Sequence, residues 1–332
     1  MTQRVRVGLV LGAGGVVGQA YHSGVLAALE HDLDWDPRSA EVVVGTSAGS
    51  ITGMLLRRGI PASELAAWTV KAPLEAEGQL LHELVGEEIP QFDRFDLLDV
   101  VRRPPSLPGR EMLARAVLRP WHFRPLAASM ALLAPGSRDI AEQLSALRHI
   151  EGDDWPDQDL WICAVRRRDG RRVVFGRPGA PEAPIDRAIA ASCAVPGYFS
   201  PVRIGERSYV DGGAHSPTNA AVLRGRPLDL VVVVSPMSGP SGVVPRDFWE
   251  GSRWHAARTA RREIAALRAQ GIPVVAFHPD REVQEAMGND FMSRDTVEDI
   301  VQQAFLATGR HAAMPRVREA LGVLRRRRSR VA

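Results

Sequence analysis

Residues 41–58 read EVVVGTSAGSITGMLLRR, which is an apolar β-branched run, a turn with a glycine at each end, and a segment of helical composition. Residues 5–18 read VRVGLVLGAGGVVG and repeat this plan, with an apolar run that ends in a glycine-rich turn. Strand, glycine turn and helix in succession are typical of parallel sheets covered by helices. The chain therefore opens with two βα units, and we expect an α/β fold.

The rest of the chain extends this pattern. Further strand patterns occur at residues 160–165, 172–175, 208–210, 230–234 and 273–277, with helical patterns between them. Residues 72–155 lack strand patterns and are helical and apolar in composition. We interpret residues 1–315 as one domain with a helical cap inserted at about 72–155, followed by a basic C-terminal tail at 316–332. The expected architecture is a mostly parallel sheet with helices on both faces.

Composition is that of an ordinary folded protein, with 45% apolar and 24% charged residues. The net charge is +3 and the sequence pI is near 9.3, because Lys71 is the only lysine among many arginines. Arginines spread over solvated faces account for this balance, and we expect no nucleic acid partner. No acidic loop of EF-hand spacing occurs, so we expect no metal and no cofactor.

The two cysteines and the N-terminus are the features from which we infer the cellular compartment. Cys163 and Cys193 fit neither a disulfide framework nor a metal site, which favours a reducing compartment. The N-terminus lacks the apolar core of a signal peptide, and no run of about 18 apolar residues occurs. We expect a cytoplasmic protein, with membrane contact only at its periphery.

Ser47 is the central candidate for catalysis. It lies in Gly45-Thr46-Ser47-Ala48-Gly49, a G-x-S-x-G between a strand and a helix, which is the context that this motif requires. Glycines flank so sharp a turn because larger side chains would collide there, and the following helix N-terminus stabilises negative charge beside the hydroxyl. The pattern predicts a nucleophile.

The first glycine turn permits two interpretations. A dinucleotide site needs G-x-G-x-x-G, but here Gly18 comes one position late, and Gly45-Thr46-Ser47 stands where an acidic residue would bind the ribose. An oxyanion hole needs bare backbone N–H groups beside a helix N-terminus, and small residues leave them accessible. We expect an oxyanion hole, with a plain tight turn as the alternative.

Asp211 and His278 are the candidates for the base that activates Ser47. The α/β-hydrolase order of serine, acid and late histidine would use His278, which follows the strand at 273–277. Only two strands precede Ser47, however, whereas an α/β-hydrolase places its nucleophile deep in a longer sheet. Asp211 begins Asp211-Gly212-Gly213, a turn suited to close approach. A carboxylate needs partial desolvation to act as a base near neutral pH, so Asp211 should be buried.

Together these motifs resemble the patatin-like phospholipase family in order and spacing. The motifs are the first glycine turn, the Gly-Thr-Ser-Ala-Gly turn and Val210-Asp211-Gly212-Gly213. Supporting similarity lies in AASCAVPGYF at 190–199 and SPTNA at 216–220, so that the resemblance covers roughly 5–70 and 157–310. It implies a patatin-like three-layer α/β/α fold and a serine lipid acyl hydrolase of phospholipids or related acyl lipids.

The resemblance also implies the roles of individual residues. Ser47 and Asp211 would form a catalytic dyad that works without histidine. The implied oxyanion hole lies in one turn and comprises Gly14, Gly15 and the N–H of Val16, with Gly12 and Ala13 in the same turn.

Two residues of this turn depart from the family pattern. Ala13 stands where the family usually has the first glycine, and Val17 stands where it usually has Arg or Lys; residues 18–24 are also one residue longer than usual. A missing cation would weaken oxyanion stabilisation or change how the turn is anchored. It motivates the alternative of a lipid-binding homologue without turnover. An α/β-hydrolase esterase using His278 or His311 is the other alternative.

The cap and the C-terminus bear on the substrate and partners. Apolar residues in one stretch of the cap would line an acyl groove or touch a bilayer edge, or else pack on a core as any helix does. They are Trp121, Phe123, Leu126, Met130, Leu132 and Leu133. A basic run at the C-terminus is interpreted as a solvated terminus, with anionic-membrane contact as the alternative. It consists of Arg325, Arg326, Arg327 and Arg328.

Overall fold

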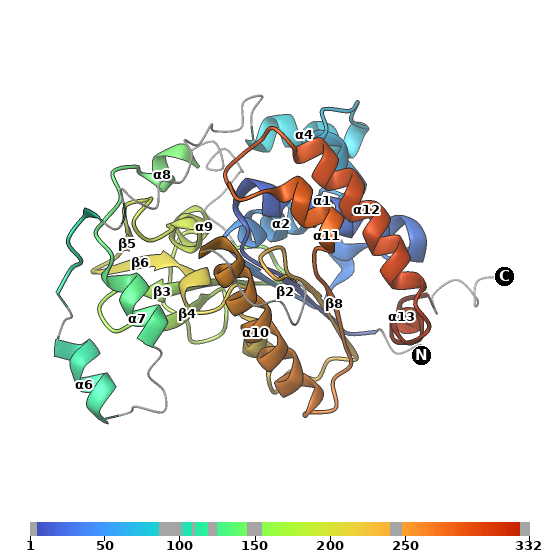
Figure 1. Ribbon diagram of the computed structural model, residues 1–332. Coiled ribbons are helices and arrows are strands. Elements are labelled where there is room, and N and C mark those ends of the chain that lie inside the picture. The colour runs from blue at the N-terminus through green and yellow to red at the C-terminus, as the bar shows by residue number, and fades with distance from the viewer. Residues whose placement is uncertain are drawn as a thin grey trace.

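A single sheet runs through the molecule (Figure 1). The computed structural model describes residues 5–85, 100, 102–107, 110–118, 125–144, 155–239 and 248–325. The eight strands follow the order β5-β6-β3-β2-β1-β7-β8, and β4 also pairs with β3. They are β1 (Val7–Leu11), β2 (Val42–Thr46), β3 (Asp159–Arg166), β4 (Arg171–Phe175), β5 (Val202–Ile204), β6 (Arg207–Asp211), β7 (Leu230–Val234) and β8 (Val274–Phe277).

The central strands are parallel, and those beyond β3 are not. β1 pairs in parallel with β2 and β7, β2 with β3, and β7 with β8. β4 and β6 run antiparallel to β3, and β5 runs antiparallel to β6. Every strand expected from the sequence is present. β5 was not expected, because its three residues are too few to form a pattern between Pro201 and Gly205.

Helices cover both faces of the sheet. The main ones are α1 (Gly15–Leu33), α2 (Ala48–Arg57), α3 (Ala62–Thr69), α9 (Ile185–Cys193), α10 (Phe248–Arg268), α11 (Arg281–Met287), α12 (Val297–Ala313) and α13 (Pro315–Arg325). Side chains alternate along each strand, so one face of β1 carries Leu9 and Leu11 and the other carries Val10. Leu9 and Leu11 pack in a core with α1, α2 and α12, and Val10 packs in a second core with α10. The expected three-layer α/β/α architecture with a mostly parallel sheet is confirmed.

The described part of residues 72–155 consists of helices and loops, with one isolated bridge from Arg138 to Phe199 and no strand. Its helices are α4 (Ala76–Val85), α6 (Arg110–Leu118), α7 (Pro125–Leu132) and α8 (Ile140–Gln143). Ala128 and Ala131 of α7 pack with Val165 of β3 and Val210 of β6. This part of the chain therefore contacts the sheet beside the end of β6. The limits of the inserted cap and of the C-terminal tail remain predictions.

Several predictions for the cap and the tail concern residues that the structure does not describe. Trp121 and Phe123 lie outside the described residues, as do Arg326, Arg327 and Arg328, and the side chains of Leu126 and Arg325 are not described. Met130 packs with the cluster of α7, β3 and β6, and so does Leu132. Among the described helices, none is both long enough and apolar enough to span a bilayer.

Candidate active site

Ser47 occupies a strained turn between β2 and α2. Its φ is +53°, a left-handed conformation that costs a residue with a side chain about 1–2 kcal/mol. A Cβ at Gly45 would collide with the backbone of Ser50, and one at Gly49 would collide with the Leu11 carbonyl. Both glycines are therefore needed for the turn to pack against α2 and β1. This geometry presents the serine at the N-terminus of α2, as the G-x-S-x-G pattern predicts.

Ser192 supports this turn from α9. Its hydroxyl accepts a hydrogen bond from the Ser47 N–H at 2.9 Å and donates one to the Cys163 carbonyl of β3 at 2.7 Å. Ser50 secures the other side, because its N–H and its hydroxyl each donate to the Ser47 carbonyl at 2.7 Å. The backbone of Ser47 is thus held on both sides.

The pairing around β3 brings Asp211 to Ser47. β4 pairs with residues 162–166 on one edge of β3, so β2 and β6 have to share the other edge. Thr46, the last residue of β2, lies opposite Cys163, and Asp211, the last residue of β6, lies opposite Ala164. The two strands therefore meet end to end at consecutive positions of β3. Ser47 and Asp211 lie at this junction, although 164 residues separate them along the chain.

Asp211 is buried, as its proposed role as a base requires. Its side chain is enclosed, it accepts a hydrogen bond from the Gly213 N–H at 2.7 Å, and it interacts with the Ser47 side chain. Burial raises the pKa of Asp211 from 3.8 to about 6, although the interactions with Gly213 and Ser47 lower it in part. Desolvation disfavours the charged carboxylate, so this group accepts a proton more readily than an exposed aspartate.

Asn219 connects the two turns that carry Ser47 and Asp211. Its side-chain amide donates to the Thr46 hydroxyl at 3.1 Å, to the Gly212 carbonyl at 3.2 Å and to the Ser216 carbonyl at 2.6 Å. Thr46 precedes Ser47 and Gly212 follows Asp211, so one buried side chain fixes the spacing of both. Asn219 itself has a φ of +52°, a conformation that asparagine tolerates better than most residues.

Glu263 of α10 supports the Asn219 loop from the opposite face of the sheet. Its carboxylate accepts hydrogen bonds from the hydroxyls of Ser216 and Thr218 at 3.0 and 2.7 Å and from the Ala220 N–H at 2.9 Å. Its other oxygen lies 4.0 Å from Arg172. Three donors thus compensate one oxygen of this buried carboxylate, while the other has Arg172 as its nearest cation. The hydrogen bonds to Glu263 therefore support the junction of β2 and β6 from the face of the sheet that α10 covers.

Sequence reasoning missed these supporting roles. Ser192 and Asn219 lie in segments that carry the family resemblance, but their hydrogen bonds join residues far apart in the chain. Glu263 lies on a helix whose sequence shows no signal of the contact. Only the three-dimensional arrangement of β2, β3 and β6 reveals what these side chains hold.

The first glycine turn lies beside this junction. A Cβ at Gly213 would come 3.3 Å from the Cβ of Ala13, so this turn contacts the Asp211 turn. The N–H groups of Gly12 and Ala13 donate to the Val234 and Pro217 carbonyls at 2.9 and 2.8 Å. These two donors hold the turn in place and are not available to an oxyanion.

The next three N–H groups behave differently. Within the described part of the chain, the N–H groups of Gly14, Gly15 and Val16 make no hydrogen bond. They begin α1, where helix geometry leaves the first donors without intrahelical partners. Gly15 has a φ of +62°, and a Cβ there would collide with the Phe291 carbonyl. The donors expected to form an oxyanion hole are therefore the open ones.

Val17 takes a structural place in this turn. Its side chain is buried in the core shared by α1, α2 and α12, and its N–H donates to the Phe291 carbonyl at 3.3 Å. The segment before α12 therefore anchors the start of α1. A cationic side chain would not fit in this apolar position without a buried partner.

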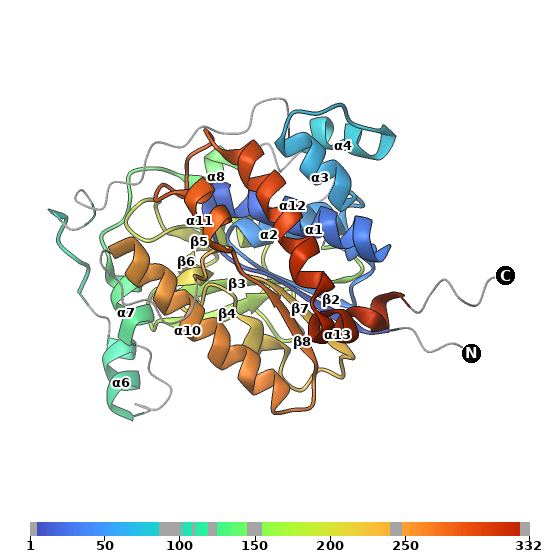
Figure 2. The same ribbon diagram turned by 45° about the vertical axis from the view of Figure 1, so that its right-hand side comes forward.

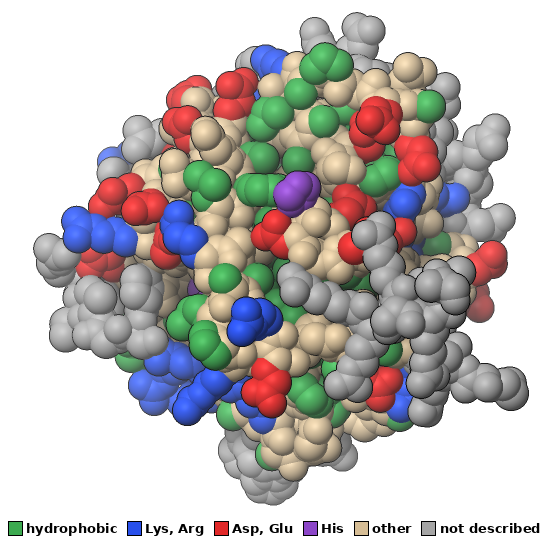
Figure 3. Space-filling view, turned by 90° about the vertical axis from the view of Figure 1, so that its right-hand side faces the viewer, with side chains coloured by type: hydrophobic (Ala, Val, Ile, Leu, Met, Phe, Trp, Pro, Cys, Tyr) green, Lys and Arg blue, Asp and Glu red, His purple; other side chains and the backbone are tan. Residues whose placement is uncertain are grey.

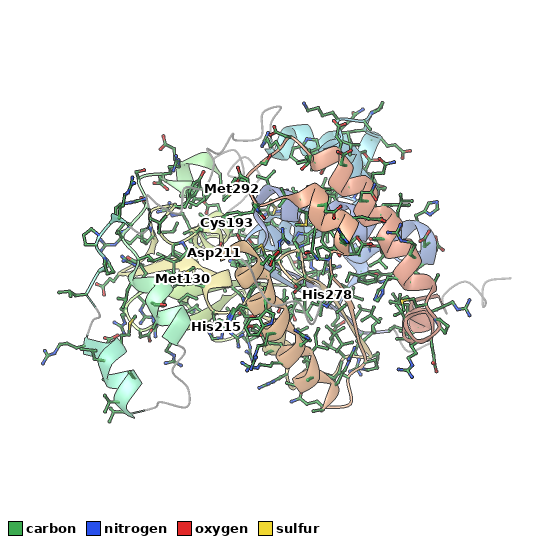
Figure 4. All side chains as sticks on the ribbon, viewed as in Figure 1. Met130, Cys193, Asp211, His215, His278 and Met292 are labelled. Atoms are coloured by element: carbon green, nitrogen blue, oxygen red, sulfur yellow. The ribbon has the colours of Figure 1, made fainter. Side chains whose placement is uncertain are left out.

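The late histidines lie elsewhere. His278 follows β8, which is three strands and about 14 Å from β2. Figure 4 shows Asp211 and Cys193 close together and His278 well apart from them. His278 is exposed, and partial desolvation together with the charges of His311 and Arg261 lowers the pKa of its ring. His311 of α12 hydrogen-bonds with the Ala276 carbonyl. The geometry does not favour an α/β-hydrolase triad through either histidine.

His22 of α1 is buried close to the first glycine turn. Its Nδ1 lies 3.4 Å from the Thr52 hydroxyl of α2, and its ring also interacts with the Gly12 carbonyl. Burial lowers the pKa of His22 to about 3, so the ring is neutral at physiological pH. It links α1 and α2 behind the turn.

Both cysteines are free and buried. Cys193 ends α9 beside the junction, where its thiol lies 3.8 Å from the Ser50 hydroxyl. Burial and the charge of Asp211 raise the pKa of Cys193 to about 12, although hydrogen bonds with Ser50 and Ser47 lower it in part. A thiol with so high a pKa is a poor nucleophile. Among the described residues, no group of three or more His, Cys, Asp and Glu could hold a metal ion.

Comparison with known proteins identifies a family whose model matches this chain. The family model described as patatin-like phospholipase matches residues 9–224, which include both Ser47 and Asp211. A search of curated proteins finds no significant match.

Solved structures match the chain at low sequence identity. They include the type III effector protein ExoU (18% identity, 95% of this chain, 53% of that chain, TM-score 0.37). A second match is VipD from Legionella pneumophila (14% identity, 96% of this chain, 67% of that chain, TM-score 0.43). A third is human GIVD cytosolic phospholipase A2 in complex with methyl gamma-linolenyl fluorophosphonate (14% identity, 96% of this chain, 59% of that chain, TM-score 0.42). The chain thus spans only about half to two thirds of the length of these proteins.

Proposed function

Because the chain belongs to the patatin-like phospholipase family, we propose that it hydrolyses carboxylic ester bonds of phospholipids or related acyl lipids, with Ser47 as nucleophile and Asp211 as base. The observation that carries this proposal is the junction of β2 and β6, where a serine in a strained turn lies beside a buried carboxylate that interacts with it. A nucleophile beside a desolvated base is the arrangement that acyl transfer requires.

The first half of the reaction transfers the acyl group to the enzyme. The Ser47 Oγ attacks the ester carbonyl carbon while its proton passes to the Asp211 carboxylate. The N–H groups of Gly14, Gly15 and Val16 stabilise the oxyanion that forms. The tetrahedral intermediate collapses, the C–O bond to the alcohol breaks, and the alcohol oxygen takes the proton from Asp211. The products of this half are the free alcohol and an ester on Ser47.

The second half returns the enzyme to its starting state. A water molecule gives a proton to Asp211 and attacks the carbonyl carbon of acyl-Ser47. The same N–H groups stabilise the second oxyanion. The bond to Ser47 Oγ breaks, the serine regains the proton, and a carboxylic acid leaves. Asp211 therefore acts as base and as acid in turn, which a pKa of about 6 suits near neutral pH.

The surroundings of Ser47 support a proton transfer between Ser47 and Asp211 that needs no histidine. His22, His278 and His311 interact with other groups, and Asp211 is the carboxylate whose pKa the Ser47 side chain affects. The apolar cluster of α7 with β3 and β6 lies beside the junction and would contact an acyl chain. Peripheral contact of the basic C-terminus with anionic membranes, and a cytoplasmic location, remain proposals.

Release of p-nitrophenol from acyl esters of several chain lengths tests this function. We expect wild type to turn over, with a preference among chain lengths, and Ser47→Ala to fall to the uncatalysed rate. The same pair of proteins is then incubated with phosphatidylcholine, lysophosphatidylcholine and triacylglycerol, and the released fatty acid is measured. A wild type that hydrolyses none of these substrates while binding lipid would favour the alternative of a lipid-binding homologue.

A further inference from the structure

A hollow lies at the β8 edge of the sheet, far from the junction of β2 and β6. It is lined by residues of β8, of α10, and of the end of α12 with the start of α13, and Figure 2 shows these elements next to one another. Its volume of about 870 Å³ falls within the range of small-molecule sites, roughly 300–1,000 Å³. We call this hollow the edge groove.

The edge strand offers only hydrogen-bond donors to the edge groove. Val231 of β7 and Ser235, which follows β7, donate to the Pro273 and Phe277 carbonyls at 2.9 and 3.0 Å, so residues 273, 275 and 277 face β7. The backbone groups of Val274 and Ala276 consequently point outward. Arg268 donates to the outward carbonyl of Val274 at 2.8 Å, and the His311 ring interacts with that of Ala276.

The outward N–H groups of Val274 and Ala276 have no acceptor among the described residues. An added peptide strand would need acceptors as well as donors from the edge, because its own N–H and C=O groups alternate. The edge groove cannot satisfy such a strand. A ligand that carries acceptors alone, such as a carboxylate, matches it.

The walls add positive charge to these donors. Arg261 and Arg316 are exposed at the edge groove, one on each wall, and the lining contains no carboxylate. Arg316 has no hydrogen-bond partner in the described part of the chain. Figure 3 looks onto this end of the molecule, where Lys and Arg side chains gather beside hydrophobic ones. The basic tail that follows α13 has the same sign of charge and is an unsuitable occupant.

An apolar surface accompanies the cations. Ile264 of α10, Ile272 before β8 and Val317 of α13 line the edge groove between the two walls. Transfer of an acyl chain onto such a surface is favourable because it removes apolar area from water. Charge at the walls and apolar side chains between them match a molecule with an anionic head and a hydrocarbon chain.

We propose that the edge groove binds a long-chain fatty acid, with the carboxylate at Arg261 and Arg316 and the chain along Ile264, Ile272 and Val317. The choice of a fatty acid over other anionic amphiphiles rests on the proposed function, since ester hydrolysis releases this molecule beside the protein. The binding itself does not depend on Ser47.

Titration with dodecanoate, below its micelle concentration, tests the proposal by calorimetry. Three double variants are compared with wild type: Arg261→Glu with Arg316→Glu, the neutral Arg261→Gln with Arg316→Gln, and the control Arg262→Glu with Arg318→Glu. The control residues are exposed on the same two helices but do not line the edge groove. Methyl dodecanoate and inorganic phosphate serve as ligands without the charge and without the chain. Thermal unfolding and hydrolysis of a short-chain ester are measured on every variant.

We expect the Kd for dodecanoate to rise at least tenfold in the glutamate variant, less in the glutamine variant, and less than twofold in the control. Methyl dodecanoate and phosphate should bind at least tenfold more weakly than dodecanoate. Equal affinity of dodecanoate for all variants would place it elsewhere and overturn the proposal, and so would displacement by an equal concentration of phosphate. If no ester is hydrolysed but these differences hold, the proposed function fails and the fatty acid site stands.

Discussion

Asp211 and His278 each end or follow a strand of the same sheet, and the protein around each favours its neutral form. Burial raises the pKa of Asp211 to about 6, and partial desolvation with nearby cationic groups lowers the pKa of the exposed His278. Asp211 meets the Ser47 side chain, whereas His278 neighbours His311 and Arg261. A shifted pKa is therefore not sufficient to identify a base. The position of the strand end relative to a nucleophile decides between the two groups.

The largest effect should come from removing the carboxylate at the junction. We expect Asp211→Asn to lower kcat/KM for a p-nitrophenyl ester about 10³-fold to 10⁴-fold, because an amide cannot accept the Ser47 proton. The exposed Asp295→Asn should retain wild-type activity and serves as the control. A loss smaller than tenfold in Asp211→Asn would show that another group activates Ser47.

The pH dependence of the wild type should report the same carboxylate. Asp211 is active as a base only when deprotonated, so kcat/KM should rise with pH through about 6 and level off above 7. The profile is measured between pH 4.5 and 8.5 with an uncharged ester. A rise centred near 4 would contradict the buried environment, and a rise that disappears in His278→Ala would assign the titration to the histidine.

Burial of Asp211 should also make folding stability depend on pH. The folded pKa lies above the unfolded value of 3.8, so the folded state binds the proton more tightly. This contribution is present below pH 3.8 and is lost as the pH rises through about 6, and it amounts to about 3 kcal/mol. The asparagine of Asp211→Asn does not titrate, so this pH-dependent contribution is absent from the variant.

The free energy of unfolding of Asp211→Asn, relative to wild type, should therefore increase between pH 4 and pH 7. Urea unfolding at a series of pH values measures the difference. A difference that stays constant with pH would contradict the raised pKa, and Asp295→Asn should show no such trend.

A smaller effect is expected from Asn219, which supports the junction without contacting substrate. Asn219→Gly removes the hydrogen bonds to Thr46 and Gly212 yet suits the φ of +52°. We expect kcat to fall about 10-fold to 100-fold with little change in KM, because a displaced base misaligns the reacting atoms. Unfolding free energy should fall by about 1–3 kcal/mol. The exposed Asn289→Gly is the control. Unchanged kcat would limit Asn219 to a structural role.

The smallest effect is expected at the other end of the sheet. His278→Ala and His311→Ala should each change kcat/KM less than twofold, since neither ring lies near Ser47. The measurement uses the same p-nitrophenyl ester at pH 8. A loss of 100-fold in either variant would reverse the comparison and return the α/β-hydrolase mechanism to consideration.

Much of the frame could be predicted from local patterns. The G-x-S-x-G turn, the first glycine turn and the β-branched runs each depend on neighbours in the sequence, so the parallel strands and the strained turn at Ser47 were expected and are present. The three-residue β5 was missed because its pattern is too short. Asp211 stood out because two glycines follow it.

The rest depends on contacts between distant segments. That β2 and β6 share one edge of β3 follows from the pairing of β4 on the other edge, which no local pattern encodes. The same holds for Ser192 and Asn219, whose partners lie 145 and 173 residues away. In the first glycine turn, only the structure separates the N–H groups that hold the turn, those of Gly12 and Ala13, from the open donors after them.

Reaction with a fluorophosphonate, followed by intact mass and peptide mapping, tests the Ser47–Asp211 dyad most directly. This reagent reports nucleophilicity of the serine without requiring knowledge of the natural substrate. The account predicts one adduct, on Ser47, that forms at least 100-fold more slowly in Asp211→Asn and at the wild-type rate in His278→Ala. An adduct on another residue, or equally rapid labelling of Ser47 in Asp211→Asn, would contradict it.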